Sequence, residues 1–170
     1  MKDKIIIAIV IVVIIVAGIG GFLYYNSTAS NGHMAISVAD APALSGVGAV
    51  YISFSSVELH SNTSGWANYS VPSTTINILG LTTTNASLLT NITLHSGKYT
   101  MIRLFIKNVT VDVLGVNMSF TLSSHFAFIN HPFNVAAHST TGIVIDFNLN
   151  QNLNLNSKVF TPNVGFVVTS

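Results

Sequence analysis

The sequence predicts an all-β protein: an antiparallel β-sandwich of the immunoglobulin or prealbumin type, preceded by one N-terminal transmembrane helix. Three observations support this fold class. Residues 5–23 form an uninterrupted apolar run, and the segments after residue 33 alternate apolar and polar side chains with a period of two. Turn-forming residues separate these segments at short intervals, and no long helical pattern follows the apolar run. Many short strands without long helices are typical of a sandwich.

The apolar run, IIIAIVIVVIIVAGIGGFL, contains no charged or polar side chain and no proline. As a helix it would rise about 28 Å, close to the thickness of a bilayer's hydrocarbon core. Its many β-branched residues favour strand in water, but a segment in lipid must satisfy its backbone hydrogen bonds internally, so helix is favoured. We expect a membrane anchor. A cleaved signal peptide is the alternative, because residues 27–29 (STA) have the small side chains of a cleavage site.

The charges that flank this run predict its orientation. Lys2 and Lys4 precede it, and the next basic residue is Lys98. The positive-inside rule therefore places the N-terminus in the cytoplasm and the rest of the chain outside the cell membrane, which is crossed once. The expected organisation is a cytoplasmic stub (1–4), a transmembrane helix (5–23), a linker (24–32) and an extracellular β-sandwich domain (33–170).

The exported part is formally neutral and has no cysteine. The chain has six basic and five acidic residues. Two of the basic residues and one of the acidic residues precede the apolar run, so four of each kind remain in the exported part. This balance provides no positive patch for phosphate groups and argues against nucleic-acid binding. Without disulfides the domain must depend on its apolar core, for which about 145 residues are sufficient.

Seven Asn-x-Ser/Thr sequons make N-linked glycans the expected modification. The acceptors are Asn26, Asn62, Asn68, Asn85, Asn91, Asn108 and Asn117. A glycan acceptor must be exported and exposed, which agrees with the predicted orientation, and residues 62–91 are the expected glycan-bearing region. The alternative is that a chain rich in Ser, Thr and Asn generates sequons incidentally.

Alternation of apolar and polar residues predicts the strands. Their expected ranges are 34–38, 49–60, 66–71, 75–79, 98–107, 109–114, 116–122, 125–129, 133–137, 141–149, 159–161 and 165–169. The apolar face of the second strand changes phase after Phe54, so we expect a β-bulge near Ser55 and Ser56. The strand 98–107 is apolar on both faces, as a central strand would be.

Three connections are also predicted. Gly115 separates two strands in the clearest hairpin. A single helical turn is expected around residues 85–89. Residues 150–157 (NQNLNLNS) are expected to form a polar loop or an exposed edge hairpin.

Several stretches of the domain are similar to a known family. MAISVADAP, AVYISFSSVELH, TINILGL, SGKYTMIRLFI and HSTTGIVIDFNL occur in this order, with a Trp between the second and the third. Over residues 34–168 the chain resembles domain of unknown function 4382, most specifically at 40–42 (DAP), 97–100 (GKYT) and 145–147 (IDF). The resemblance implies an exported or membrane-anchored bacterial or archaeal β domain, and it supplies no catalytic residue or cofactor.

Three charged residues fall within or at the end of predicted strands. Asp40 ends the first strand, Arg103 lies in the apolar strand 98–107, and Asp146 shares a strand face with Val144. A partly buried charge needs a partner, and Arg binds carboxylates through two hydrogen bonds. We therefore expect a structural ion pair or turn cap among Asp40, Arg103 and Asp146. The alternative is a cation site of carboxylate and carbonyl oxygens, a ligand set suited to calcium.

His125, His131 and His138 are the candidates for a metal site. Their spacing matches no zinc pattern, and none has a Cys or Glu nearby. The three side chains would have to converge from strand ends, so no metal and no cofactor are predicted.

The sequence also lacks the patterns of common enzymes. Glu58 is its only glutamate, and nothing places two carboxylates together as a glycosidase requires. No Gly-x-Ser-x-Gly elbow, glycine-rich phosphate loop or HExxH helix is present. We therefore expect that the protein is not an enzyme.

The expected function is a structural or adhesive binding module of the cell envelope, with other surface proteins or further copies of itself as partners. One alternative is a subunit of a filament or lattice that assembles by strand addition at residues 148–156, where no Lys or Pro protects the edge. Another is a metal- or substrate-binding accessory subunit of a membrane complex.

Overall fold

A computed structural model describes residues 13–25, 30–40 and 44–169. In this part of the chain the structure contains eleven strands and, besides the helix at 13–25, one helical turn. The first strands are β1 (Asn31–Asp40), β2 (Val47–Ser61), β3 (Gly65–Asn77), β4 (Ser87–His95), β5 (Gly97–Val113) and β6 (Val116–Leu122). The others are β7 (Phe126–Val135), β8 (Thr140–Phe147), β9 (Leu153–Asn154), β10 (Val159–Phe160) and β11 (Val164–Thr169), with α2 (Leu149–Asn152) after β8.

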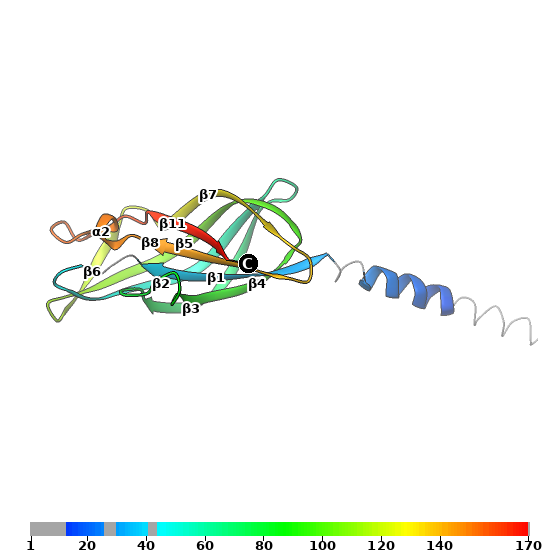
Figure 1. Ribbon diagram of the computed structural model, residues 1–170, viewed down its shortest axis with the longest axis horizontal. Helices are drawn as coiled ribbons and strands as arrows, with labels where there is room; N and C mark the ends of the chain where they lie inside the picture. The colour runs from blue at the N-terminus through cyan, green and yellow to red at the C-terminus, as the bar shows by residue number, and fades with distance from the viewer. Residues whose placement is uncertain (1–12, 26–29, 41–43, 170) are drawn as a thin grey trace, which may run out of the picture.

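The domain is all-β and consists of two sheets (Figure 1). One sheet has four strands in the order β11-β8-β1-β4, and the other has the order β3-β2-β5-β6-β10-β9 with β7 also paired to β5. The long strand β5 is central, as predicted: β2 covers one of its edges, while β7 and β6 share the other. The prediction of a purely antiparallel arrangement is wrong, because β1 pairs with β8, and β6 with β10, in parallel.

The two sheets share one apolar core. Every second residue of β1 from Met34 to Val38 is fully buried, and β2 and β5 contribute similar rows. Phe147 lies between Phe54 and Phe160, with ring centroids 6.1 Å and 6.2 Å away. Rings and branched aliphatic side chains from both sheets thus fill the interior, which replaces the disulfides that this chain lacks.

Two local predictions are confirmed. The register of β2 shifts between Phe54 and Ser56 against both of its neighbours, which is the predicted bulge. Residues 114 and 115 form the predicted hairpin turn, with φ values of 53° at Leu114 and 83° at Gly115. Positive φ at both central residues matches the right-handed twist of the paired strands.

Other predicted boundaries are wrong. The predicted strands 66–71 and 125–129 stop before Pro72 and Pro132, but both prolines lie inside strands, in β3 and β7. Both are edge strands, and each proline falls where the pairing register is interrupted, so the missing N–H group removes no ladder hydrogen bond. The helical turn expected at 85–89 is wrong as well, since β4 begins at Ser87.

The segment proposed as an exposed edge is not one continuous strand. Its first part forms α2, in which Leu149 and Asn152 are buried. The next residues form β9, which is already paired with β10. β9 is the last strand of its sheet, and residues 154–158 are exposed, so an exposed edge hairpin is present here, as one of the two predicted alternatives.

The N-terminal apolar run is described only from residue 13, and residues 13–25 are helical. Residues 5–12 of the predicted anchor, and residues 26–29 of the predicted linker, lie outside the described residues. Within the part of the chain that is described, no helix has both the length and the apolar character needed to cross a membrane.

Candidate ligand-binding surface

Arg103 is the centre of an aromatic cluster on the outer face of the larger sheet. Its neighbours Ile102 and Leu104 are fully buried in the core, so alternation directs Arg103 away from it. The guanidinium carbon lies 4.0 Å from the ring centroid of Trp66, which is on β3. The corresponding distances to Phe126 and Phe128, both on β7, are 5.6 Å and 5.9 Å. These distances are typical of cation–π contacts.

The rings of this cluster are accessible. Trp66, Phe126 and Phe128 are 37%, 38% and 44% exposed. Phe105 lies beside Phe126, with ring centroids 5.8 Å apart. We call Trp66, Arg103, Phe105, Phe126 and Phe128 the aromatic face. A group of exposed large rings with an arginine has the composition of a binding surface rather than of an ordinary solvated sheet face.

A hydrogen-bond network fixes Arg103 in this cluster. Its Nη1 atom lies 3.3 Å from Oε2 of Glu58, directly opposite on β2. The amide of Asn68 donates to the other carboxylate oxygen of Glu58 over 3.4 Å. The predicted pairing of Arg103 with Asp40 or Asp146 is therefore wrong: register brings Glu58 opposite the arginine, and the two aspartates lie on strands of the other sheet.

Asp40 and Asp146 lie close enough for their charges to interact. Asp40 is 5% exposed, and burial raises its pKa to about 6. The nearby charge of Asp146 raises this pKa further, while hydrogen bonds from the backbone of Leu149 and Gly80 lower it. One oxygen, Oδ1, accepts a hydrogen bond of 3.2 Å from Leu149 N, and Oδ2 is buried without a partner. Asp40 is thus a buried cap of the α2 region rather than half of an ion pair.

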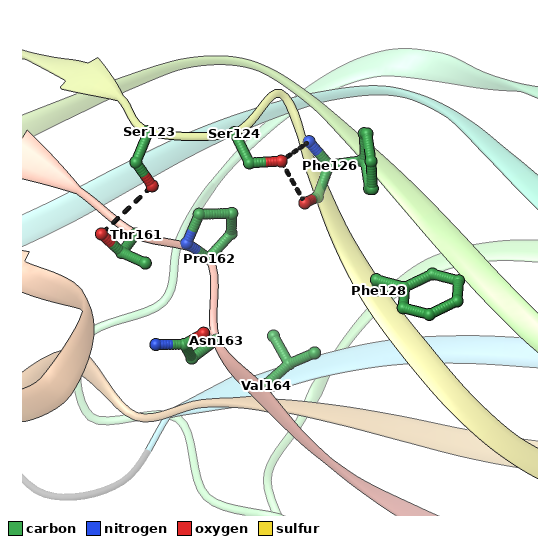
Figure 2. A pocket seen from close by; sticks show the side chains of 8 residues that line it. All are labelled: Ser123, Ser124, Phe126, Phe128, Thr161, Pro162, Asn163 and Val164. Carbon is green, nitrogen blue, oxygen red and sulfur yellow. Dashed lines mark hydrogen bonds between the residues drawn. The ribbon is translucent and has the colours of Figure 1, made fainter.

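A hollow of about 330 Å³ begins at the edge of the aromatic face (Figure 2). Figure 2 shows residues of the β6–β7 connection and β7 on one side and the segment leading into β11 on the other. Ser124 Oγ bonds both the backbone N and the backbone O of Phe126, over 3.2 Å and 2.9 Å. Ser123 donates to the hydroxyl of Thr161 over 3.1 Å, which joins the two sides. The lining residues are Ser123, Ser124, Phe126, Phe128, Thr161, Pro162, Asn163 and Val164.

A second hollow, of about 280 Å³, shares Asn163 and Val164 with the first as lining residues. Its lining residues are Asp146, Asn148, Gln151, Asn163, Val164 and Gly165. Asp146 Oδ1 and Asn148 Oδ1 are buried without a hydrogen-bond partner. Asp146 pairs with Ala39, close to the end of β1, so this hollow lies at the opposite end of β1 from the point where the chain enters it. We call the two hollows together the polar groove.

A third hollow, of about 520 Å³, lies at the other end of the domain, next to the first residues of β1. Tyr69 and Tyr99 line it, and burial raises the pKa of both phenols. Tyr99 is held in place, because its hydroxyl donates to His95 O over 3.0 Å and its ring stacks on Phe133 at 5.6 Å. Asp40, Asp146 and Asn148, which carry the buried oxygens without a partner described above, lie outside the lining of this hollow.

The three candidate metal-binding histidines do not converge. His131 packs against Phe166 with ring centroids 5.1 Å apart, whereas His138 occupies the β7–β8 turn with a φ of 56°. His125 immediately precedes β7. Over the described ranges, no three His, Asp or Glu side chains are grouped so that they could hold a metal ion.

Six of the seven sequon asparagines are described, and all six are exposed: Asn62, Asn68, Asn85, Asn91, Asn108 and Asn117. Asn26 lies outside the described residues. Asn68 is notable because it follows Trp66 by two residues on β3 and so shares the outer face with it. A sugar on Asn68 would lie beside the aromatic face.

The aromatic face is the feature that the sequence analysis missed. Its members occupy the positions of their strands that alternate with core residues, where a sandwich ordinarily has polar side chains. The sequence did contain a signal of this surface: large aromatic residues at strand positions out of phase with the core, namely Trp66, Phe126 and Phe128. Recognising that they meet around Arg103 required the pairing of β2, β3, β5 and β7.

Comparison with known proteins gives a family but no characterised relative. The family model DUF4382, described as a domain of unknown function, matches residues 31–166. The chain matches no curated protein and no solved structure.

Proposed function

Because the chain belongs to the DUF4382 family, whose function is unknown, we propose its role from its own surface: a membrane-anchored extracellular module that binds a partner and catalyses no reaction. The apolar run at 5–23 and its basic flank support the anchor and its orientation. The exposure of six sequon asparagines supports N-glycosylation. We also assign the sandwich to the immunoglobulin or prealbumin type.

The aromatic face is the observation that carries this proposal. Exposed rings on the solvent side of a sheet lower solubility unless a partner covers them. Trp and Arg are the residue types that contribute most to binding energy at protein interfaces. Glu58 holds the guanidinium of Arg103 against Trp66, so the surface is already ordered before a partner arrives.

The carboxylates support binding rather than catalysis. Glu58 is neutralised by Arg103, and Asp40 is buried. Asp112 accepts a hydrogen bond of 2.8 Å from Gly115 N in the β5–β6 turn. Asp146 lies close enough to Asp40 for their charges to interact, but Asp40 is buried, so these two carboxylates do not face each other across an open cleft as acid–base hydrolysis would require.

Retention of the detergent-solubilised full-length protein on cell-envelope material freed of membrane lipid tests this function, because the apolar run then has no bilayer to enter. The variant Trp66→Ser, whose side chain lies outside the polar groove, is expected to weaken retention by at least about ten-fold while the melting temperature changes little, since this side chain is exposed. Leu88→Ser removes an apolar side chain that is 59% exposed on β4 and is the matched control. Equal retention of Trp66→Ser and the control would refute a binding role for the aromatic face.

A further inference from the structure

We propose that the polar groove binds a neutral saccharide. This inference rests on the proposed binding function and names the chemical class of its ligand. It uses a part of the surface distinct from the Trp66 side of the aromatic face, so the two proposals fail separately.

The lining of the groove is suited to sugar hydroxyl groups. Asn148, Gln151 and Asn163 contribute amides, and hydroxyls come from Ser123, Ser124 and Thr161. Amides and hydroxyls both donate and accept hydrogen bonds, as sugar hydroxyls do. Since no basic residue lines either hollow, the groove favours a neutral saccharide over an acidic one.

Two buried acceptors in the groove lack donors. Asp146 Oδ1 and Asn148 Oδ1 both belong to residues that line the smaller hollow, and neither has a hydrogen-bond partner. Leaving a buried acceptor without a donor is unfavourable, so a hydroxyl that donates to it is stabilising. These residues are two apart around the end of β8, and both line the smaller hollow, so a small rotation of either side chain would turn its unpartnered oxygen toward a bound hydroxyl.

The opposite wall of the groove is rigid. The side chain of Asn152, which is 1% exposed, donates to Asn163 O over 2.7 Å and accepts from Asn163 N over 3.2 Å. This clamp fixes the backbone of Asn163, the residue shared by both hollows. Asn152 is therefore a positioning residue, because it holds the backbone from which the side chain of Asn163 projects.

The size and surroundings of the groove argue for a ligand larger than an ion. Its hollows, of about 280 Å³ and 330 Å³, share Asn163 and Val164 as lining residues, and each is much larger than an ion. Phe126 and Phe128 border the larger one and offer apolar surface to the C–H side of a sugar ring. A calcium ion requires six to eight oxygen ligands, generally with several carboxylates, whereas Asp146 is the only acid that lines the groove.

Calorimetric titration of the full-length chain tests the proposal. The protein is produced in a host that adds no N-glycans and kept in a zwitterionic detergent without a sugar headgroup. The probes are neutral gluco-, manno-, galacto- and xylo-oligosaccharides, acidic oligosaccharides, and calcium chloride alone. Saturable binding of at least one neutral oligosaccharide is expected, with no binding of the other two classes of probe.

Three variants locate the site. Gln151→Ala and Asn163→Ala, both at exposed side chains, are expected to lower the affinity at least about ten-fold without a change in melting temperature. Asp146→Asn provides a second test at the unpartnered acceptor. Asn117→Ala removes an exposed amide on β6 that is outside the groove and is expected to bind as the parent does.

Several outcomes would overturn the proposal. These are binding of calcium alone that Asp146→Asn abolishes, absence of binding to every neutral oligosaccharide, and sugar binding that the three groove variants leave unchanged. If envelope retention still depends on Trp66 in any of these cases, the proposed function stands and only its saccharide ligand is refuted. If saccharide binding is confirmed but Trp66→Ser is retained normally, the saccharide ligand stands and the binding role of the aromatic face is refuted.

Discussion

The substitution Asp40→Asn measures what a buried carboxyl group costs this fold. Asp40 is 5% exposed, and burial raises its pKa from 3.8 to about 6. A carboxyl group with a raised folded-state pKa stabilises the fold fully only below its unfolded value. That stabilisation is lost as the pH rises through about 6. The rise from 3.8 to about 6 corresponds to about 3 kcal/mol of unfolding free energy.

The amide of the variant has nearly the shape of the carboxyl group and carries no charge. Its oxygen can still accept the hydrogen bond from Leu149 N that Asp40 Oδ1 receives. We therefore expect Asp40→Asn to be about 2–3 kcal/mol more stable than the parent at pH 7 and equally stable near pH 4.

Urea unfolding followed by circular dichroism at pH 4, 5, 6 and 7 gives this difference directly, because the titration of groups common to both proteins cancels. Asp112→Asn, at the half-buried carboxylate of the β5–β6 turn, controls for the loss of one formal charge. A stability difference that does not change with pH, or a variant less stable than the parent at pH 7, would refute the reasoning.

Three other measurements test the fold and its surface. Gly142→Ala should destabilise the protein by about 1–3 kcal/mol in thermal unfolding. The added Cβ would meet the Thr169 side chain and lie 2.9 Å from the Thr169 backbone oxygen, whereas Gly165→Ala meets only ordinary contacts from 3.6 Å and should be tolerated. A double-mutant cycle on Glu58 and Arg103 should give a coupling of about 0.2–1 kcal/mol, because both side chains are partly exposed; a value above about 2 kcal/mol would contradict this view. The intact mass of protein from its native source should exceed the polypeptide mass by several glycans, and a bare polypeptide mass would remove the glycosylation argument.

The features that the sequence predicts correctly are local. The phase change after Phe54 required a bulge whatever lay beside β2, and Gly115 permitted a tight turn between two apolar segments. The strand 98–107 was apolar on both faces and is indeed central in its sheet. Each of these depends on residues within a few positions of one another, so one sequence contains the necessary information.

The features that the sequence leaves undetermined depend on which strands become neighbours. Glu58 and Arg103 are 45 positions apart and meet only through the register of β2 and β5. The same holds for the rings of the aromatic face and for the two segments that form the polar groove. Pro72 and Pro132 were misplaced for a related reason: proline excludes a central strand, and only the assembled sheet shows which strands are at its edges.

The parallel pairing of β1 with β8 has a mechanical consequence. β1 is hydrogen-bonded along most of its length to β4 on one side and β8 on the other, and the chain enters it at Asn31. Tension between the N-terminal segment and a ligand held at the opposite end of β1 would act parallel to this strand. The hydrogen-bond ladders on both sides of β1 would then be loaded in shear. Many hydrogen bonds would share the force, instead of breaking one after another from the end of the strand. Such an arrangement lets a small domain without covalent cross-links remain folded while it is pulled.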